Sequence, residues 1–137
     1  MTEIAKILVP VDFSANTEKL LDFAAFFAKK FGATLSLLHV VENPAAYEGY
    51  FVAKIEEEIR AAMAQKMTAL LEKYPGSSGE VLIGDTVDTI TTLARRYDLV
   101  IIGTHGYRGL EKIVMGSVAE RVVKNASCPV LVFNPYK

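Results

Sequence analysis

The sequence predicts an α/β protein built on one open, parallel, five-stranded sheet with helices on both faces. Short apolar, β-branched runs alternate with longer segments in which apolar residues recur every three or four positions. Glycine, proline and asparagine separate the two kinds of segment. Strands that alternate with helices imply parallel pairing with right-handed crossovers. Two strand orders, 3-2-1-4-5 and 2-1-3-4-5, fit this pattern equally well.

Length and composition limit the class of protein. The 137 residues are expected to form a single domain, residues 1–137, which is large enough to bury a core. Fifteen basic and 16 acidic side chains leave no basic excess for nucleic acid. One cysteine cannot form an internal disulfide, which fits an intracellular setting. The N-terminus does not look like a signal peptide, and no apolar run approaches the ~20 residues of a membrane span. We therefore expect a cytoplasmic protein that binds neither nucleic acid nor membrane.

Five apolar runs are expected to form the strands. They are residues 4–11, 34–41, 80–83, 98–102 and 130–133. Most of them are apolar on both faces, which is typical of strands buried in a parallel sheet. The last run is also apolar, and we expect it at an edge of the sheet, where unpaired backbone groups invite a partner strand.

Four helices are expected between the strands. The first ends before Gly32, and the other three comprise residues 53–74, 86–97 and 117–125. An irregular segment, residues 45–52, is expected to lead into the second helix. Ser14 or Asn16 can cap the first and Asp85 the third, while Ser117 and Glu120 form a capping box for the fourth.

The first two helices carry apolar stripes that are expected to face the sheet. In the first helix the stripe comprises Leu20, Ala24, Phe27, Ala28 and Phe31. In the second it comprises Ile55, Ile59, Met63, Met67, Leu70 and Tyr74.

The most informative stretch is the glycine-rich segment after the fourth strand. Gly103, Gly106 and Gly116 follow the spacing G-x2-G-x9-G, and Ser117 begins the next helix. Glycines let backbone N–H groups approach a ligand, and a helix N-terminus attracts anions. We interpret the segment as a phosphate-binding loop, although it matches neither the Walker A motif nor the compact dinucleotide fingerprint.

The glycine spacing resembles the signature of the ATP-binding branch of the universal stress protein family. The resemblance continues at Thr104-His105 and in the runs VPVDFS, LHVV and SCPVLV, at residues 9–14, 38–41 and 127–132. It implies a Rossmann-like fold of the adenine nucleotide alpha hydrolase type with strand order 3-2-1-4-5. In that order the first and fourth strands are neighbours, so a ligand would bind between Asp12 and the Gly103 loop.

The resemblance also implies which residues bind the cofactor, ATP or AMP, with Mg²⁺ as a bridge between phosphates. Pro10 and Val11 would line the base and sugar pocket, and the Asp12 carboxylate would accept a hydrogen bond from ribose or adenine. Val40 would hold adenine through its backbone. The remaining expected binding residues are Gly103, Thr104, His105, Gly106, Arg108, Gly109, Gly116, Ser117 and Val118.

Several of these residues have a purely structural alternative. Asp12 can be a turn residue, Ser117 a helix cap, and His105 and Arg108 solvated loop residues. The two alternatives for Ser117 are compatible, because a cap can also donate its hydroxyl to a phosphate.

No catalytic motif accompanies the glycine loop. His39 lies in an apolar strand and is interpreted as a hydrogen-bonded core histidine, and Cys128 as a structural residue. The favoured function is a nucleotide-responsive regulatory module in stress response, as the resemblance implies. The alternatives are a slow ATP hydrolase or phosphotransfer protein that uses the same pocket, and a nucleotide-free dimeric scaffold. The resemblance further implies a homodimer through residues 130–133.

Overall fold

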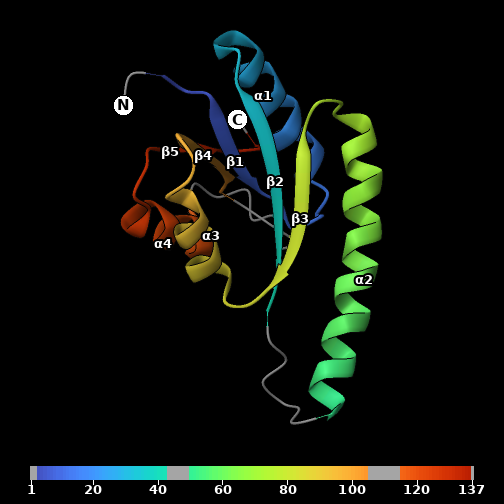
Figure 1. The fold of residues 1–137 in the computed structure, drawn as a ribbon. Helices are drawn as coiled ribbons and strands as arrows, with labels where there is room; N and C mark the ends of the chain where they lie inside the picture. The colour runs from blue at the N-terminus through green and yellow to red at the C-terminus, as the bar shows by residue number, and fades with distance from the viewer. Residues whose placement is uncertain (1–2, 43–49, 105–114, 137) are drawn as a thin grey trace.

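The alternation of strands and helices is confirmed by the computed structural model, which describes residues 3–42, 50–104 and 115–136 (Figure 1). The elements in chain order are β1 (Lys6–Pro10), α1 (Thr17–Phe31), β2 (Thr34–Val41), α2 (Tyr50–Lys73), β3 (Ser78–Ile83), α3 (Thr86–Ala94), β4 (Leu99–Gly103), α4 (Ser117–Asn125) and β5 (Val130–Phe133). In this part of the chain no helix is long and apolar enough to cross a membrane.

The five strands pair in parallel in the order β3-β2-β1-β4-β5. This confirms the order 3-2-1-4-5 and rules out the alternative in which β3 lies beside β1. Ile7 of the central strand pairs with Leu35 of β2 on one side and Leu99 of β4 on the other. The chain leaves β1 and β4 at the same edge of the sheet, which is where doubly wound sheets bind ligands.

Asp98 fixes the neighbouring strands β1 and β4 at their amino ends. Its Oδ2 accepts hydrogen bonds from the backbone N–H groups of Ala5 and Lys6, each at 2.9 Å. Its own N–H donates to the Lys6 carbonyl at 2.9 Å. The two backbone donors lower the pKa of the Asp98 carboxyl, because they stabilise its charged form.

Helices cover both faces of the sheet (Figure 1). Side chains from α1 and α2 pack with Ile7, Val9 and their neighbours on one face. Those from α3 and α4 pack with Leu8 and Val100 on the other. Successive side chains of a strand point to opposite faces, so one apolar strand supplies both cores.

Two apolar residues that the periodicity assigns to the sheet are exposed instead. Ile59 of α2 is 37% exposed and Phe31 of α1 is 54% exposed. In Figure 1 the N-terminal half of α2 extends past the ends of the strands, so only its C-terminal half, with Met67 and Leu70, packs on the sheet. Periodicity identifies the apolar face of a helix but not how far the sheet extends beneath it.

Some boundaries differ from those expected. α2 already begins at Tyr50, so the part of the expected irregular lead-in that the structure describes is helical. β3 begins at Ser78 rather than 80. α3 ends at Ala94 rather than near 97, because the N–H groups of Arg96 and Tyr97 bond three residues back, in tighter turns.

A polar contact joins α2 to α1. The Tyr74 hydroxyl donates to Asp22 Oδ1 at 2.8 Å and also contacts the Glu18 carbonyl at 3.3 Å. Lys73 forms an ion pair with the Glu18 carboxylate at 3.2 Å. Burial raises the pKa of the Tyr74 hydroxyl, and the hydrogen bond to Asp22 and the nearby negative charges add to the effect.

We predict that Tyr74→Phe lowers the free energy of unfolding by about 1 kcal/mol, because it removes the hydrogen bond and keeps the ring. The loss should shrink as the pH rises above the ordinary phenol pKa of 10.0. There the unfolded wild type releases a proton that the folded protein retains, so wild-type stability falls. Urea denaturation at several pH values measures both effects. A difference that stays constant above about pH 10 would contradict the raised pKa.

Candidate functional site

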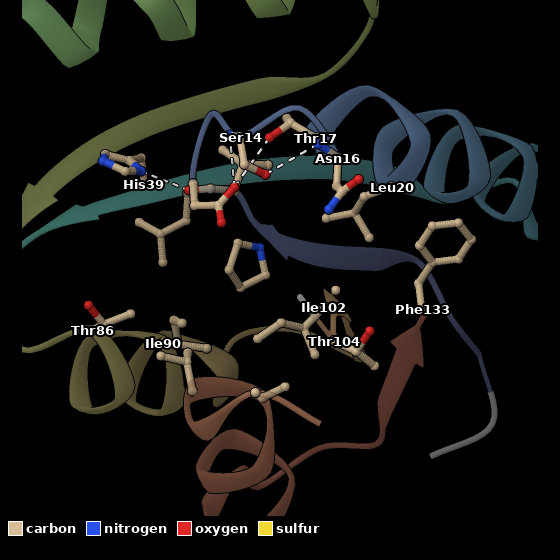
Figure 2. A pocket seen from close by; sticks show the side chains of 18 of the residues that line it. Ser14, Asn16, Thr17, Leu20, His39, Thr86, Ile90, Ile102, Thr104 and Phe133 are labelled. Carbon is tan, nitrogen blue, oxygen red and sulfur yellow. Dashed lines mark hydrogen bonds between the residues drawn. The ribbon is translucent and has the colours of Figure 1, made fainter. Parts of the chain in front are cut away.

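The carboxyl ends of the strands open into a cavity of about 420 Å³ (Figure 2). Residues at the ends of β1, β2, β4 and β5 line it, together with residues from the starts of α1, α3 and α4. Its volume lies in the range of roughly 300–1,000 Å³ that is usual for small-molecule sites.

Nine of the thirteen sequence-predicted binding residues line this cavity. They are Pro10, Val11, Asp12, Val40, Gly103, Thr104, Gly116, Ser117 and Val118. The other four, His105, Gly106, Arg108 and Gly109, lie outside the described residues. The structure therefore gathers residues from three separate parts of the chain around one space.

Other lining residues were not identified from the sequence as part of a site. They are Ser14, Asn16, Thr17, Leu20, Leu38, His39, Thr86, Ile90, Ile102, Ala119, Phe133 and Pro135. Most are apolar or small and resemble ordinary core and cap residues, so the sequence carries no signal for them. The polar ones near Asp12 could have been found from their place at the start of a helix that follows a strand.

Asp12 is both a turn residue and a cavity residue. Its Oδ1 accepts hydrogen bonds from the Ser14 N–H at 3.0 Å and from the Thr17 hydroxyl at 3.4 Å. Among the described residues, Oδ2 has no hydrogen-bond partner. Phe13, which follows it, has φ 59, a left-handed backbone that costs a bulky residue about 1–2 kcal/mol. The tight turn thus occupies one carboxylate oxygen and leaves the other available at the cavity.

His39 supports the same turn from β2. Its Nδ1 lies 2.7 Å from the Val11 carbonyl, which can only accept, so Nδ1 carries the hydrogen. The ring also packs against Phe13, with 4.7 Å between the centroids. The expected hydrogen-bonded histidine is therefore confirmed, although His39 is partly rather than fully buried.

The start of α4 lies against the end of β4. The Gly116 N–H donates to the Thr104 carbonyl at 2.8 Å. A Cβ added to Gly116 would lie 2.8 Å from that same oxygen, closer than real Cβ atoms approach. Since the obstacle is backbone, a glycine is required here for steric reasons.

The expected capping box at α4 is wrong. Gly116 occupies the N-cap position, and among the described residues no side chain caps the helix. Ser117 is the first helical residue, and the Glu120 carboxylate pairs with Lys124 at 3.0 Å instead. The close approach of Gly116 to Thr104 shifts the helix start by one residue. Without a side-chain cap, the first-turn N–H groups of α4 are available at the cavity wall.

The other two expected caps have different outcomes. Asp85 caps α3, because its Oδ2 accepts from the Asp88 N–H at 2.9 Å. Asn16 occupies the N-cap position of α1, but its side chain makes no capping hydrogen bond. The turn before α1 is held instead by Asp12 and by the Ser14 carbonyl, which accepts from the Thr17 N–H at 3.1 Å.

The described lining has an uneven polarity. One wall is apolar and is formed by Leu38, Ile90, Ile102 and Ala119. Asp12 is the charged side chain in the described part of the lining, which includes no lysine or arginine. Within the described lining, an anion would be attracted by the positive end of the α4 dipole and by uncharged hydrogen-bond donors.

Comparison with known proteins gives consistent matches. The model of the universal stress protein family matches residues 3–134. The chain is 34% identical over 134 residues to universal stress protein A homolog 1 of Coxiella burnetii, covering 91% of this chain and 92% of that one.

Solved structures show the same likeness. Universal stress protein UspA from Lactobacillus plantarum superposes with a TM-score of 0.81 at 26% identity, over 97% of this chain and 99% of that one. The universal stress protein from Archaeoglobus fulgidus in complex with dAMP gives a TM-score of 0.63 at 25% identity, over 93% and 96%.

We predict that Gly116→Ala destabilises the protein by about 1–3 kcal/mol, because the new Cβ displaces the start of α4 from Thr104. Ser117→Ala is the matched control. It should change stability by no more than about 0.5 kcal/mol, since Ser117 is exposed and caps nothing. Chemical denaturation measures the stability of the two variants. A larger loss of stability for Ser117→Ala than for Gly116→Ala would show that Ser117 caps the helix after all.

Proposed function

The chain belongs to the universal stress protein family, and we propose that its cavity binds an adenine nucleotide, ATP or AMP, as part of a regulatory module in stress response. The cavity combines an apolar wall with an uncapped helix N-terminus, and this observation carries the proposal. A purine needs an apolar wall to pack against, and a phosphate needs the N–H groups of a helix N-terminus. The dAMP complex of the Archaeoglobus relative supports the same class of ligand.

The proposed arrangement follows the two ends of the cavity. Adenine would lie between Ile90 and the end of β2, where the Val40 backbone can hold its edge. The free oxygen of Asp12 would accept a ribose hydroxyl, and the phosphates would meet Gly116 and Ser117 at the start of α4. In Figure 2, Thr86 and Ile90 lie toward one end of the pocket, and Thr104 and Phe133 toward the other.

The proposal assigns the chain to the ATP-binding branch of the family, with the glycine spacing as the support. Mg²⁺ prefers phosphate oxygens with one or two carboxylates. Asp12 is the carboxylate in the described lining, so any Mg²⁺ would be held chiefly by the phosphates.

The first experiment identifies what the protein carries. Protein purified without added nucleotide is denatured, and the released small molecules are identified by mass. We predict a stoichiometric adenine nucleotide in the wild type. An empty protein that also fails to bind ATP or AMP by calorimetry would contradict the proposal.

Asp12→Asn is the variant for this experiment, because Asn can keep the Oδ1 contacts to Ser14 and Thr17 and changes only the atom left for ligand. We predict a roughly tenfold loss of nucleotide affinity with unchanged stability. If Asp12 acted only by charge, its removal would strengthen the binding of an anion. A gain in affinity would therefore contradict the ribose contact.

We also propose that the chain forms a homodimer through β5. Within the described residues this strand lies at the edge of the sheet, beside β4 alone. The Pro129 carbonyl accepts from the Val100 N–H of β4 at 3.0 Å, and the Phe133 carbonyl from the N–H of Thr104, just after β4, at 2.9 Å. Backbone groups of a strand alternate in direction, so those of Val130 and Val132 point toward the open edge. They can pair with the same strand of a second copy.

Val132→Pro should give a monomer, because it removes a backbone N–H at the open edge and spares the bonds to β4. Val132→Ala, which keeps that N–H, should remain a dimer. Light scattering at micromolar concentration measures both masses. A monomeric wild type would contradict the proposed dimer.

A further inference from the structure

We propose that Asn16 is a specificity-determining residue of the nucleotide site, and that its side-chain amide donates a hydrogen bond to a phosphate oxygen. Asn16 would thereby favour phosphorylated ligands over the bare nucleoside. The inference rests on the proposed function and concerns the same cavity.

The side chain of Asn16 does not cap α1, although Asn16 occupies the N-cap position of that helix. Asparagine at an N-cap normally accepts a hydrogen bond from the first turn of its helix. Here the backbone of Asn16 has φ −89 and ψ −5, and the side chain makes no such bond. Within the described residues the amide has no hydrogen-bond partner at all, although the residue is only partly exposed. Neighbouring groups hold the turn instead, which leaves the amide available.

The amide is also one of two side-chain donors that remain on this wall, the other being the Ser14 hydroxyl. The Thr17 hydroxyl already donates to Asp12 at 3.4 Å. The Ser14 hydroxyl oxygen accepts from the Asn16 N–H at 3.3 Å. Asp12 itself, when ionised, can only accept. An anion that contacts this side of the cavity therefore finds two side-chain donors, the Ser14 hydroxyl and the Asn16 NH₂, and the amide offers two hydrogens where the hydroxyl offers one.

The position of Asn16 places this donor opposite the proposed phosphate site. Asn16 lines the cavity, and Figure 2 shows its side chain pointing inward from the start of α1, with Thr104 on the opposite wall. The Gly116 N–H is bonded to the Thr104 carbonyl, so the start of α4 lies at that same wall. A phosphate held by α4 would thus face the amide of Asn16 across the cavity.

Charge makes such a neutral donor important. The described lining supplies no lysine or arginine, and Asp12 adds a negative charge. A hydrogen bond to a charged group contributes more than one between neutral groups. Asparagine and aspartate have the same shape, but aspartate offers oxygen and charge where asparagine offers NH₂. Replacing asparagine by aspartate therefore tests phosphate recognition while the packing stays the same.

The experiment measures ATP and adenosine binding by calorimetry for the wild type, Asn16→Ala and Asn16→Asp. We expect ATP affinity to fall roughly tenfold in Asn16→Ala and further in Asn16→Asp, while adenosine affinity changes by less than about twofold. Aspartate is as good an N-cap as asparagine and is favoured by the helix dipole. The melting temperature of Asn16→Asp should therefore not fall, which distinguishes lost recognition from lost folding.

Ala15→Asp is the matched control. Ala15 is exposed in the same turn and does not line the cavity, so this variant adds the same charge beside the site. It should leave ATP affinity within about threefold of the wild type.

Three results would overturn the inference. They are an unchanged ATP affinity in Asn16→Asp, an equal loss of adenosine, or an equal loss of ATP in Ala15→Asp. A wild type that binds neither ligand refutes the proposed function instead. That outcome is recognised from the wild type alone, before any variant is compared.

Discussion

The pairing of β1 with β4 is the constraint on which the site depends. It brings residues more than 90 positions apart in the chain into register, Ile7 with Leu99 and Leu8 with Val100. Asp98 secures it at the amino ends through two backbone N–H groups at 2.9 Å. At the carboxyl ends the chain then departs from the two strands toward opposite faces of the sheet, and the cavity forms between them.

The turn after β1 and the start of α4 each combine a structural contact with a group left free. At β1, Asp12 commits one oxygen to the turn and keeps the other for the cavity. At β4, Gly116 binds the Thr104 carbonyl and leaves the first turn of α4 without a side-chain cap. In each case a backbone contact of about 3 Å positions the group that the proposed ligand would use.

The sequence predicted the strands and helices well wherever the signal was local. Apolar runs marked all five strands, and Gly32 and Asp85 marked a helix end and a helix start correctly. It failed where distant parts of the chain decide the outcome. Ile59 is exposed because the sheet ends before it, and Ser117 does not cap because Gly116 must approach Thr104.

By itself the sequence predicted the fold class, because hydrophobic periodicity is a property of short segments, and its resemblance to the universal stress protein family is confirmed by the family model. Nine of its thirteen expected site residues line one cavity. The tertiary structure alone decided the roles within that cavity. Asn16 looked like a helix cap, but in the structure its side chain makes no capping bond and lines the cavity. A hydrogen bond between groups depends on their distance in space, which the order of residues does not give.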